Sequence, residues 1–303
     1  MDGRGGWKRI FVTNGTVRSP WRILLFAVLF LALLIVGAWI VGPGKRGAET
    51  LFRQGAVTLA AALISGWVLL AWLDRRSPGA LGFGWTPQTP REAGLGFLIG
   101  GGSLALIVAV FALAGWLEYR SEPGTAALYA GVLAGDLVLL AVAAASEEAL
   151  FRGYPFQVLV QAIGPVTATL LSSALFSVAH AANPNVGPLA LINIFLAGVL
   201  LAAAYLRTRS LWFATAVHLG WNWTMASLLD LPVSGLAFFD APLYEPVETG
   251  PAWVTGGAFG PEGGIGASVA FLLALWATLR LPGLDEPEKM RELRPLVDDR
   301  MID

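Results

Sequence analysis

The chain has 303 residues, of which 56% are hydrophobic and only 14% are charged, and its formal net charge is −1. A soluble protein of this length carries about a quarter charged residues, so most of this chain must be solvated by lipid. The near-neutral charge gives no basic signature for nucleic-acid binding. Because the chain contains no cysteine, disulfides, thiolate metal sites and a cysteine nucleophile are all excluded.

Apolar segments long enough to cross a bilayer recur along the whole chain. A membrane-spanning helix needs about 20 mostly apolar residues. This criterion predicts eight spans, at residues 22–42, 55–73, 94–116, 127–146, 166–182, 188–206, 210–229 and 265–281. In the third segment, Gly96, Gly100, Gly101 and Gly102 give one face of small residues, which favours close helix packing. We therefore predict an all-α fold: a polytopic transmembrane helix bundle of about eight spans with a buried active-site cavity.

Positive charge is distributed unevenly among the predicted loops. Basic residues gather before the first span and in two short loops: Arg4, Lys8, Arg9, Arg18, Arg22, Arg75, Arg76, Arg207 and Arg209. The long loop at 230–264 contains several acidic residues and no Lys or Arg. Cytoplasmic loops are enriched in Lys and Arg, so we expect both termini in the cytosol and the acidic loop outside. Lys45, Arg46 and Arg53 run against this assignment, since eight spans place their loop outside.

Two adjacent carboxylates, Glu147 and Glu148, follow the apolar segment that begins at Leu128. Charged side chains inside a bilayer are costly and usually mark function. Glu148 and Arg152 are four residues apart, in the acid-first order that favours an ion pair on a helix. Glu147 lies about 100° further round the helix and remains available to face a cavity. The alternative is that all three residues form a structural ion network at the membrane boundary.

The only two histidines of the chain also lie in apolar helical segments. His180 ends one such segment, and His218 is followed four residues later by Asn222, which places their polar groups on one helix face. A lone histidine in this setting is more often a hydrogen-bonded packing residue, and Asn222 alone would join two helices. Two histidines together with a carboxylate pair indicate a functional site.

Chain length predicts that two of these groups meet. About 15 residues separate Glu147 from an expected turn at Gly164, and another 15 lead on to His180. Two antiparallel helices of equal length return the chain to the same height, so Glu147 should face His180. We expect Pro155 to kink the first of these helices, because proline cannot continue the hydrogen-bond pattern.

The expected depth of the histidines adds a constraint on the next connection. His218 lies nine residues after Arg209, which puts it about 13 Å inside the cytosolic boundary. For His180 to reach the same level, the connection at 183–188 must dip into the membrane. Non-helical backbone is tolerated there only where it lines a cavity or is buried in protein.

Two mechanisms fit these groups. The Gly-x-Ser-x-Gly and His-Glu-x-x-His patterns are both absent from the chain. In the first mechanism, Glu147 is a general base that takes a proton from a water oriented by His180, while His218 and Asn222 stabilise the oxyanion. In the second, Glu147, His180 and His218 bind a divalent metal that activates the water, and their ligand types suit zinc. The sequence demands no other cofactor.

Three motifs occur in order: Glu147-Glu148-x-x-x-Arg152, Phe176-x-x-x-His180 and His218-x-x-x-Asn222. Over residues 125–230 the chain resembles the CPBP family, which comprises CAAX prenyl endopeptidases of the Rce1 type together with bacteriocin-processing and bacteriocin-immunity proteins. The resemblance implies a peptidase site inside a helical membrane bundle. It implies these roles: Glu147 as the water-activating carboxylate, His180 as its partner, His218 and Asn222 on the oxyanion side, and Glu148 and Arg152 in support.

From the resemblance we expect an intramembrane endopeptidase of a family named for metalloproteases, in a bacterial or archaeal cell membrane. Its partners would be the lipid bilayer and a peptide or protein substrate, with membrane-anchored and prenylated substrates among the candidates, and no nucleic acid. We expect a cytosolic N-terminal segment at 1–21, transmembrane helices at 22–123, a CPBP-like catalytic core at 124–281 and a cytosolic tail at 282–303.

Two other functions remain open at this stage. A non-catalytic bacteriocin-immunity or regulatory membrane protein can retain the same motifs. A transporter can use buried glutamate and histidine residues as a proton relay. The sequence has no visible inverted repeat and no paired set of broken helices, which argues against transport.

Overall fold

A computed structural model describes residues 11–299 except 14–15, 43 and 45–46. Five basic residues used above to orient the chain therefore lie outside the described residues: Arg4, Lys8, Arg9, Lys45 and Arg46. Most of the predicted 1–21 segment lies outside them as well.

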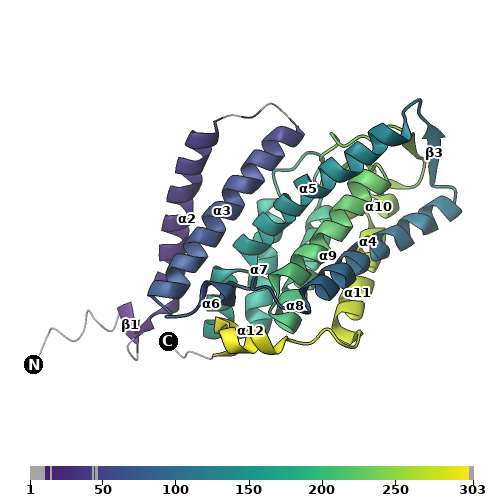
Figure 1. Cartoon of the computed structure of the whole chain (residues 1–303). Helices are drawn as coiled ribbons and strands as arrows, with labels where there is room; N and C mark the ends of the chain where they lie inside the picture. The colour runs from purple at the N-terminus through teal and green to yellow at the C-terminus, as the bar shows by residue number, and fades with distance from the viewer. Residues whose placement is uncertain (1–10, 14–15, 43, 45–46, 300–303) are drawn as a thin grey trace, which may run out of the picture.

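Helices form most of the described chain (Figure 1). The longer ones are α2 (Ser19–Val41), α3 (Ala48–Trp72), α4 (Thr89–Leu113), α5 (Ala126–Phe151), α6 (Tyr154–Ile163), α7 (Pro165–Ala179), α8 (Pro188–Thr208), α9 (Leu211–Trp223) and α11 (Ile265–Arg280). Short helical elements are η1 (Pro78–Leu81), the π-helical turn η2 (Thr224–Leu228), α10 (Ala252–Thr255), η3 (Gly257–Phe259), η4 (Pro261–Gly263), α12 (Glu288–Leu293) and η5 (Leu296–Asp298). The predicted helical membrane bundle is confirmed.

The predicted count of eight spans is not confirmed. Within the described residues, five segments are long and apolar enough to cross a bilayer: α2, α3, α4, the α5–α6 pair and α8. Helices α7 and α11 are apolar but shorter, and α9 has 13 residues before it passes into η2. The hydropathy of a segment depends only on its composition and does not show where a helix ends. Helices α7, α9 and α11 end within the apolar segments that the sequence predicts as full spans.

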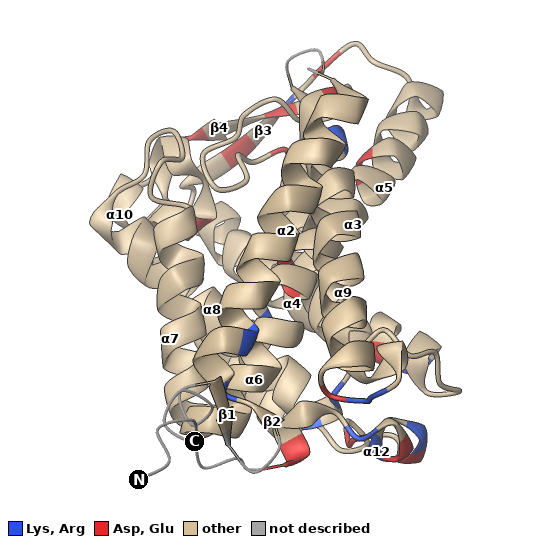
Figure 2. Ribbon diagram, turned by 90° about the vertical axis from the view of Figure 1, so that its left-hand side faces the viewer, with Lys and Arg blue, Asp and Glu red and all other residues tan. Residues whose placement is uncertain are grey.

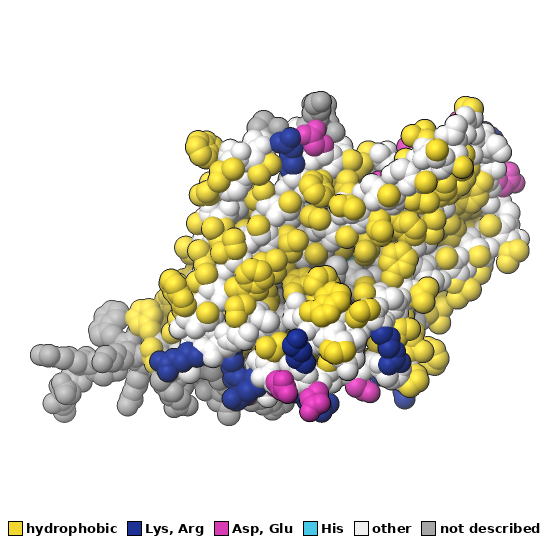
Figure 3. Space-filling view, in the orientation of Figure 1, with side chains coloured by type: hydrophobic (Ala, Val, Ile, Leu, Met, Phe, Trp, Pro, Cys, Tyr) yellow, Lys and Arg dark blue, Asp and Glu magenta, His cyan; other side chains and the backbone are white. Residues whose placement is uncertain are grey.

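Exposed apolar side chains form a band around the bundle. Figure 3 shows hydrophobic side chains covering the middle of one face, with charged residues toward its two ends. Many large apolar residues point outward from the helices, among them Ile35 at 68% and Trp39 at 84% exposed on α2, Leu113 at 89% on α4 and Trp276 at 65% on α11. Such a surface is stable only in contact with lipid. The chain is an integral membrane protein.

Two small antiparallel sheets lie at opposite ends of the bundle (Figures 1 and 2). Strands β1 (Val12–Thr13) and β2 (Thr16–Val17) lie at the same end as α12. At the other end, β3 (Leu117–Ser121) pairs with β4 (Tyr244–Glu248) in a register that sets Tyr119 opposite Pro246. This second sheet ties the 230–264 loop to the segment between α4 and α5. We refer below to the α12 end and the β3–β4 end.

Close packing of α4 on α9 rests on glycine, as the sequence predicts. A Cβ on Gly96 would lie 2.8 Å from the carbonyl oxygen of Phe213, and a Cβ on Gly100 would clash with the carbonyl oxygen of Val217. Gly102, on the same helix, faces open space. Because α9 carries His218 and Asn222, the α4–α9 contact also fixes the position of these two side chains.

A buried ion pair fastens the N-terminal helix to the rest of the bundle. Arg22 on α2 is 1% exposed and its Nη2 lies 2.5 Å from Oδ1 of Asp74, just after α3. It also donates to the Tyr154 hydroxyl oxygen at 3.2 Å and to Oε1 of Gln161 at 2.7 Å, both on α6. One guanidinium thus joins α2, α3 and α6 near the α12 end.

We expect Gly100→Ala to lower the stability of the protein by about 1–3 kcal/mol, because the new methyl group has no space against the backbone of α9. The matched control is Gly102→Ala on the same helix, which should be neutral or stabilising by up to about 1 kcal/mol, since alanine is the better helix former. Thermal unfolding in detergent measures both. Equal midpoints for the two variants would contradict this packing.

Candidate active site

Glu147 and Glu148 lie near the C-terminal end of α5, just before the helix breaks. Helix α5 ends at Phe151, and α6 restarts at Tyr154 with a proline in its first turn. Pro155 has no N–H to donate and its ring clashes with the preceding turn, which favours a kink or a break in the helix. The predicted kink is therefore a complete interruption, and it frees the end of α5 to line a cavity.

The two acids are in different surroundings. The Glu148 side chain is fully buried, and Nη1 of Arg152 donates to its Oε1 at 3.1 Å. Nη2 of Arg152 donates to the carbonyl oxygen of Gly198 on α8 at 3.2 Å, and the guanidinium lies over the Phe176 ring at 4.5 Å. The Glu147 side chain is 34% exposed. The i, i+4 spacing thus predicts the ion pair correctly, and Glu147 is left to face open space.

His180 follows the last residue of α7 and faces Glu147. Its Nδ1–H donates to the carbonyl oxygen of Phe176 at 2.8 Å, which directs Nε2 toward the cavity. That Nε2 lies 3.9 Å from Oε2 of Glu147. The α5–α6 and α7 segments therefore bring Glu147 and His180 together, as the equal chain lengths on either side of Gly164 predict.

His218 reaches the same carboxylate from α9. Its Nδ1 lies 3.0 Å from Oε1 of Glu148 and donates to that carboxylate, while its Nε2 lies 3.9 Å from Oε2 of Glu147. This contact adds to the sequence interpretation, which gave Glu148 only one partner, Arg152. Glu148 also orients His218. Both histidines consequently present Nε2 to one oxygen of Glu147, an atom that has no hydrogen-bond partner among the described residues.

The connection between α7 and α8 is non-helical, in agreement with the depth argument. The Asn183 side chain donates to the carbonyl oxygen of Ser234 at 2.9 Å, and that of Asn185 donates to the carbonyl oxygen of Ala258 at 3.4 Å. The 230–264 loop therefore lies against this connection. Its depth in a bilayer stays a prediction.

A cavity of about 290 Å³ contains the site. It is lined by residues of α3, α5, α7, the α7–α8 connection, α9 and the 230–264 loop: Leu51, Leu140, Ala143, Glu147, Phe151, Ala179, His180, Asn183, His218, Asn222, Val233, Ser234, Leu236 and Phe239. Four predicted site residues therefore share one cavity, namely Glu147, His180, His218 and Asn222. Glu148 and Arg152 lie behind its wall. The lining is mostly apolar, which strengthens electrostatic interactions among the few polar groups.

The Glu147 oxygen and the two histidine nitrogens are further apart than the ligand atoms of a bound zinc ion. A tetrahedral zinc ion with bonds of about 2.0–2.2 Å sets its ligand atoms about 3.4 Å apart. Here Oε2 of Glu147 lies 3.9 Å from each histidine Nε2. Among the described residues, no group of three or more His, Asp or Glu side chains is arranged to hold a metal ion. The residue types suit zinc, but their spacing does not, so we derive no chemical step through a metal.

One buried acid near the site was missed by the sequence analysis. Glu262, in η4, is 5% exposed and accepts hydrogen bonds from Nε1 of Trp221 at 3.0 Å and from the Ser234 hydroxyl at 2.5 Å. With His180 and His218 it lines a narrow apolar recess beside the main cavity. The segment Gly260-Pro261-Glu262-Gly263-Gly264 predicts a tight turn, but nothing in its sequence indicates that Glu262 is buried. Glu262 holds the loop over the site.

We expect Glu262→Ala to destabilise the protein by at least about 1–3 kcal/mol, because the indole N–H of Trp221 and the Ser234 hydroxyl both lose their acceptor. Glu245→Ala is the matched control, since Glu245 is an exposed acid of the same loop and should change stability by less than about 0.5 kcal/mol. Thermal unfolding in detergent gives both values. A loss shared equally by the two variants would mean that Glu262 does not anchor the loop.

Residues 129–224 match the family model described as type II CAAX prenyl endopeptidase Rce1-like. Comparison with curated proteins finds no match. The matched segment contains every predicted site residue and ends before the 230–264 loop. Residues 129–224 therefore form an Rce1-like domain, in agreement with the CPBP family that the three motifs indicate.

Proposed function

We propose that this protein is an intramembrane endopeptidase that hydrolyses a peptide bond with a water activated by Glu147 and His180. The observation that carries the proposal is the position of Oε2 of Glu147, 3.9 Å from Nε2 of both His180 and His218, in a cavity of about 290 Å³. These separations are too long for direct hydrogen bonds, and one water molecule can contact all three atoms.

In the first step Glu147 removes a proton from this water, and the water oxygen attacks the carbonyl carbon of the peptide bond. His180 accepts a second hydrogen bond from the water through Nε2, because its Nδ1–H is held by the carbonyl oxygen of Phe176. The apolar lining of the cavity excludes competing solvent around the reacting atoms.

In the second step negative charge develops on the former carbonyl oxygen. Asn222, one helical turn after His218 on α9, supplies an amide N–H donor on the same side of the cavity. Glu148 accepts from Nδ1 of His218 and compensates positive charge on that ring, so a protonated Nε2–H can serve as the second donor. Glu147 then returns its proton to the leaving nitrogen as the C–N bond breaks, giving a carboxylic acid and an amine, which exchange a proton to become carboxylate and ammonium.

The α12 end faces the cytosol in this proposal, in a bacterial or archaeal cell membrane. Most described Arg and Lys residues near helix ends lie there: Arg18, Arg22, Arg75, Arg76, Arg91, Arg207, Arg209, Arg280, Lys289, Arg291 and Arg294. At the β3–β4 end the described basic residues are Arg53 and Arg120. Such a bias in short loops orients membrane proteins with the basic side inside.

A non-catalytic immunity or regulatory protein remains the second candidate. Such a protein could keep Glu148, Arg152 and His218 for stability. It would have no use for an exposed Glu147 that faces two imidazole nitrogens across a cavity. Cleavage by the wild-type protein therefore separates the two functions. A transporter receives no specific support from the geometry.

We expect Glu147→Gln and His180→Ala to lower the rate of peptide cleavage by about 10²- to 10⁴-fold, since each removes a group that handles the proton of the water. Purified protein in detergent would be offered a peptide library that includes prenylated C-terminal peptides. Glu49→Gln is the control and should retain full activity, because Glu49 is a half-buried acid on α3 that pairs with Arg53 and does not line the site cavity. Unchanged cleavage in both active-site variants would exclude this site.

A separate measurement decides between the metal-free and zinc-dependent mechanisms. If Glu147 acts as a general base without metal, active protein should retain its cleavage rate after chelator treatment and contain less than stoichiometric zinc by elemental analysis. If zinc is required, activity should fall with chelator and return on addition of zinc. The second result would overturn the mechanism above and mean that the three donor atoms move closer together when the metal binds.

A further inference from the structure

We propose that Ser234 binds the substrate directly: its hydroxyl oxygen accepts a hydrogen bond from a backbone N–H of the peptide beside the cleaved bond. Ser234 lies in the 230–264 loop, after the segment that matches the family model. The inference rests on the proposed function and narrows its substrate to a peptide bound with a free N–H at that position. Proline is excluded there, because it has no backbone N–H.

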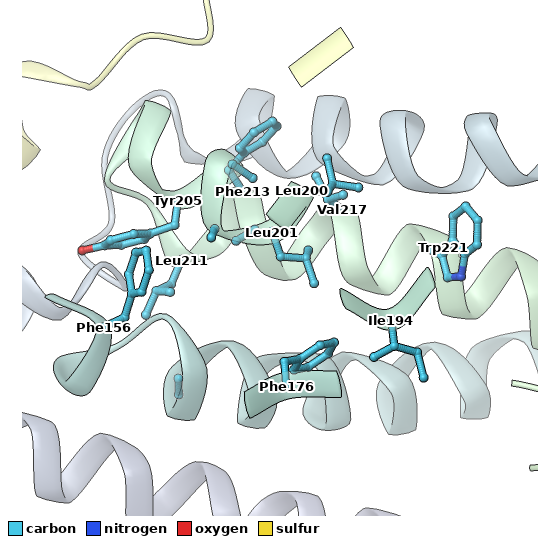
Figure 4. Packing of buried hydrophobic residues seen from close by; sticks show 14 of the residues in the cluster. Phe156, Phe176, Ile194, Leu200, Leu201, Tyr205, Leu211, Phe213, Val217 and Trp221 are labelled. Carbon is cyan, nitrogen blue, oxygen red and sulfur yellow. The ribbon is translucent and has the colours of Figure 1, made fainter. Parts of the chain in front are cut away.

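The position of Ser234 is the first observation. Among the described residues, the site cavity and the narrow recess beside it share four lining residues: His180, His218, Asn222 and Ser234. The first three already have roles in the proposed mechanism, and Ser234 has none. Figure 4 shows apolar residues that line the recess: Phe176, Ile194, Leu200, Leu201, Val217 and Trp221. A side chain at the junction of cavity and recess is placed to contact a peptide that reaches the oxyanion donors.

The backbone of Ser234 has a conformation that suits glycine. Val233 and Leu236 pair across a tight turn, with N···O distances of 3.0 and 2.8 Å. The two central residues of this turn both have positive φ, 49° at Ser234 and 83° at Gly235. Two-residue turns with this backbone favour Asn-Gly or Gly-Gly, and the left-handed region is unfavourable for most side chains. The turn alone would favour glycine or asparagine at this position, so what the serine adds is its hydroxyl group.

The Ser234 hydroxyl is held in one orientation with its acceptor side free. It donates to Oε2 of Glu262 at 2.5 Å, and Nε1 of Trp221 donates to the other oxygen of that carboxylate at 3.0 Å. Within the part of the chain that the structure describes, this is the one hydrogen bond of the hydroxyl. A serine oxygen also has two lone pairs that accept. Donation to a carboxylate polarises the hydroxyl and makes its oxygen a stronger acceptor.

The turn that carries the hydroxyl is anchored on two sides. Nδ2 of Asn183 donates to the carbonyl oxygen of Ser234 at 2.9 Å. The N–H of Gly235 donates to the carbonyl oxygen of Phe259 at 2.9 Å, and a Cβ on Gly235 would clash with the carbonyl oxygen of Pro184. The hydroxyl is thus presented to the cavity by a fixed support, so little conformational entropy is lost when a ligand binds.

A peptide in this cavity needs acceptors for its own N–H groups. The lining is mostly apolar, and a backbone N–H that leaves water without a new partner is costly. In the proposed mechanism Glu147 and His180 interact with the water. His218 and Asn222 act there as donors to the oxyanion, not as acceptors. The Ser234 oxygen therefore supplies an acceptor that the catalytic groups do not provide.

A double-mutant cycle tests the contact, because the N–H can be removed from the peptide and the hydroxyl from the protein. The probe is the library peptide that full-length Glu147→Gln protein retains most strongly in detergent, together with versions that are N-methylated at one amide each. Dissociation constants would be measured for this protein and for its combinations with Ser234→Gly, Ser234→Ala and Asn185→Gly. Glycine keeps the positive φ of the turn. Asn185, the control, has a φ of 59°, is exposed and lines neither the cavity nor the recess.

We expect N-methylation of one amide to weaken binding to the Glu147→Gln protein by about 3- to 10-fold, as for the loss of one hydrogen bond. At that amide the loss should shrink to less than about 2-fold in both Ser234 variants and stay unchanged in the Asn185→Gly control. No effect at any amide, or an equal effect with and without the hydroxyl, would overturn the contact. A loss that shrinks in only one of the two Ser234 variants would assign the effect to the turn and also overturn it.

Binding to the Glu147→Gln protein does not require catalysis. The expected pattern, together with a wild-type protein that cleaves none of the peptides, would therefore count only against the proposed function. Cleavage by the wild-type protein without the expected pattern would count only against the role of Ser234. A protein that neither retains nor cleaves any peptide of the library would overturn both.

Discussion

The rest of the site depends on one buried carboxylate, that of Glu148. An unpaired charge at this depth would be prohibitively costly, so Glu148 must be compensated on more than one side. Arg152 does so from the same helix and reaches on to α8 through Gly198, while His218 does so from α9. Three helices are thereby held in one arrangement. With Glu148 committed to this network, its neighbour Glu147 is the acid left to face the cavity.

The short length of α7 is part of the same arrangement. A helix that crossed the whole bilayer would fill the space above His180, but α7 ends at Ala179. The vacated space holds the site cavity, and the 230–264 loop covers it through Ser234, Glu262 and the β3–β4 sheet. The shortness of this apolar helix thus leaves room for a cavity with polar groups inside an apolar bundle.

Near the α12 end, helices and the C-terminal segment are held together by buried polar contacts and close packing. Two polar side chains, Arg22 and Gln157, join α2, α6 and the C-terminal segment there. A layer of buried side chains packs beside them: Phe156, Tyr205 and Leu211. At the β3–β4 end, a recess of about 930 Å³ against the 230–264 loop shares Leu236 and Phe239 with the lining of the site cavity.

Local spacing in the sequence was enough to determine the helical bundle, the Glu148–Arg152 pair, the break near Pro155, the glycine contact of α4 and the approach of Glu147 to His180. Each follows from helix geometry or from equal lengths of chain within one hairpin. Only the tertiary structure decided the contact of His218 with Glu148, the anchoring by Glu262, the β3–β4 sheet and the true lengths of α7, α9 and α11. These features join residues far apart in the chain, and no periodicity in a sequence encodes which distant segments will meet.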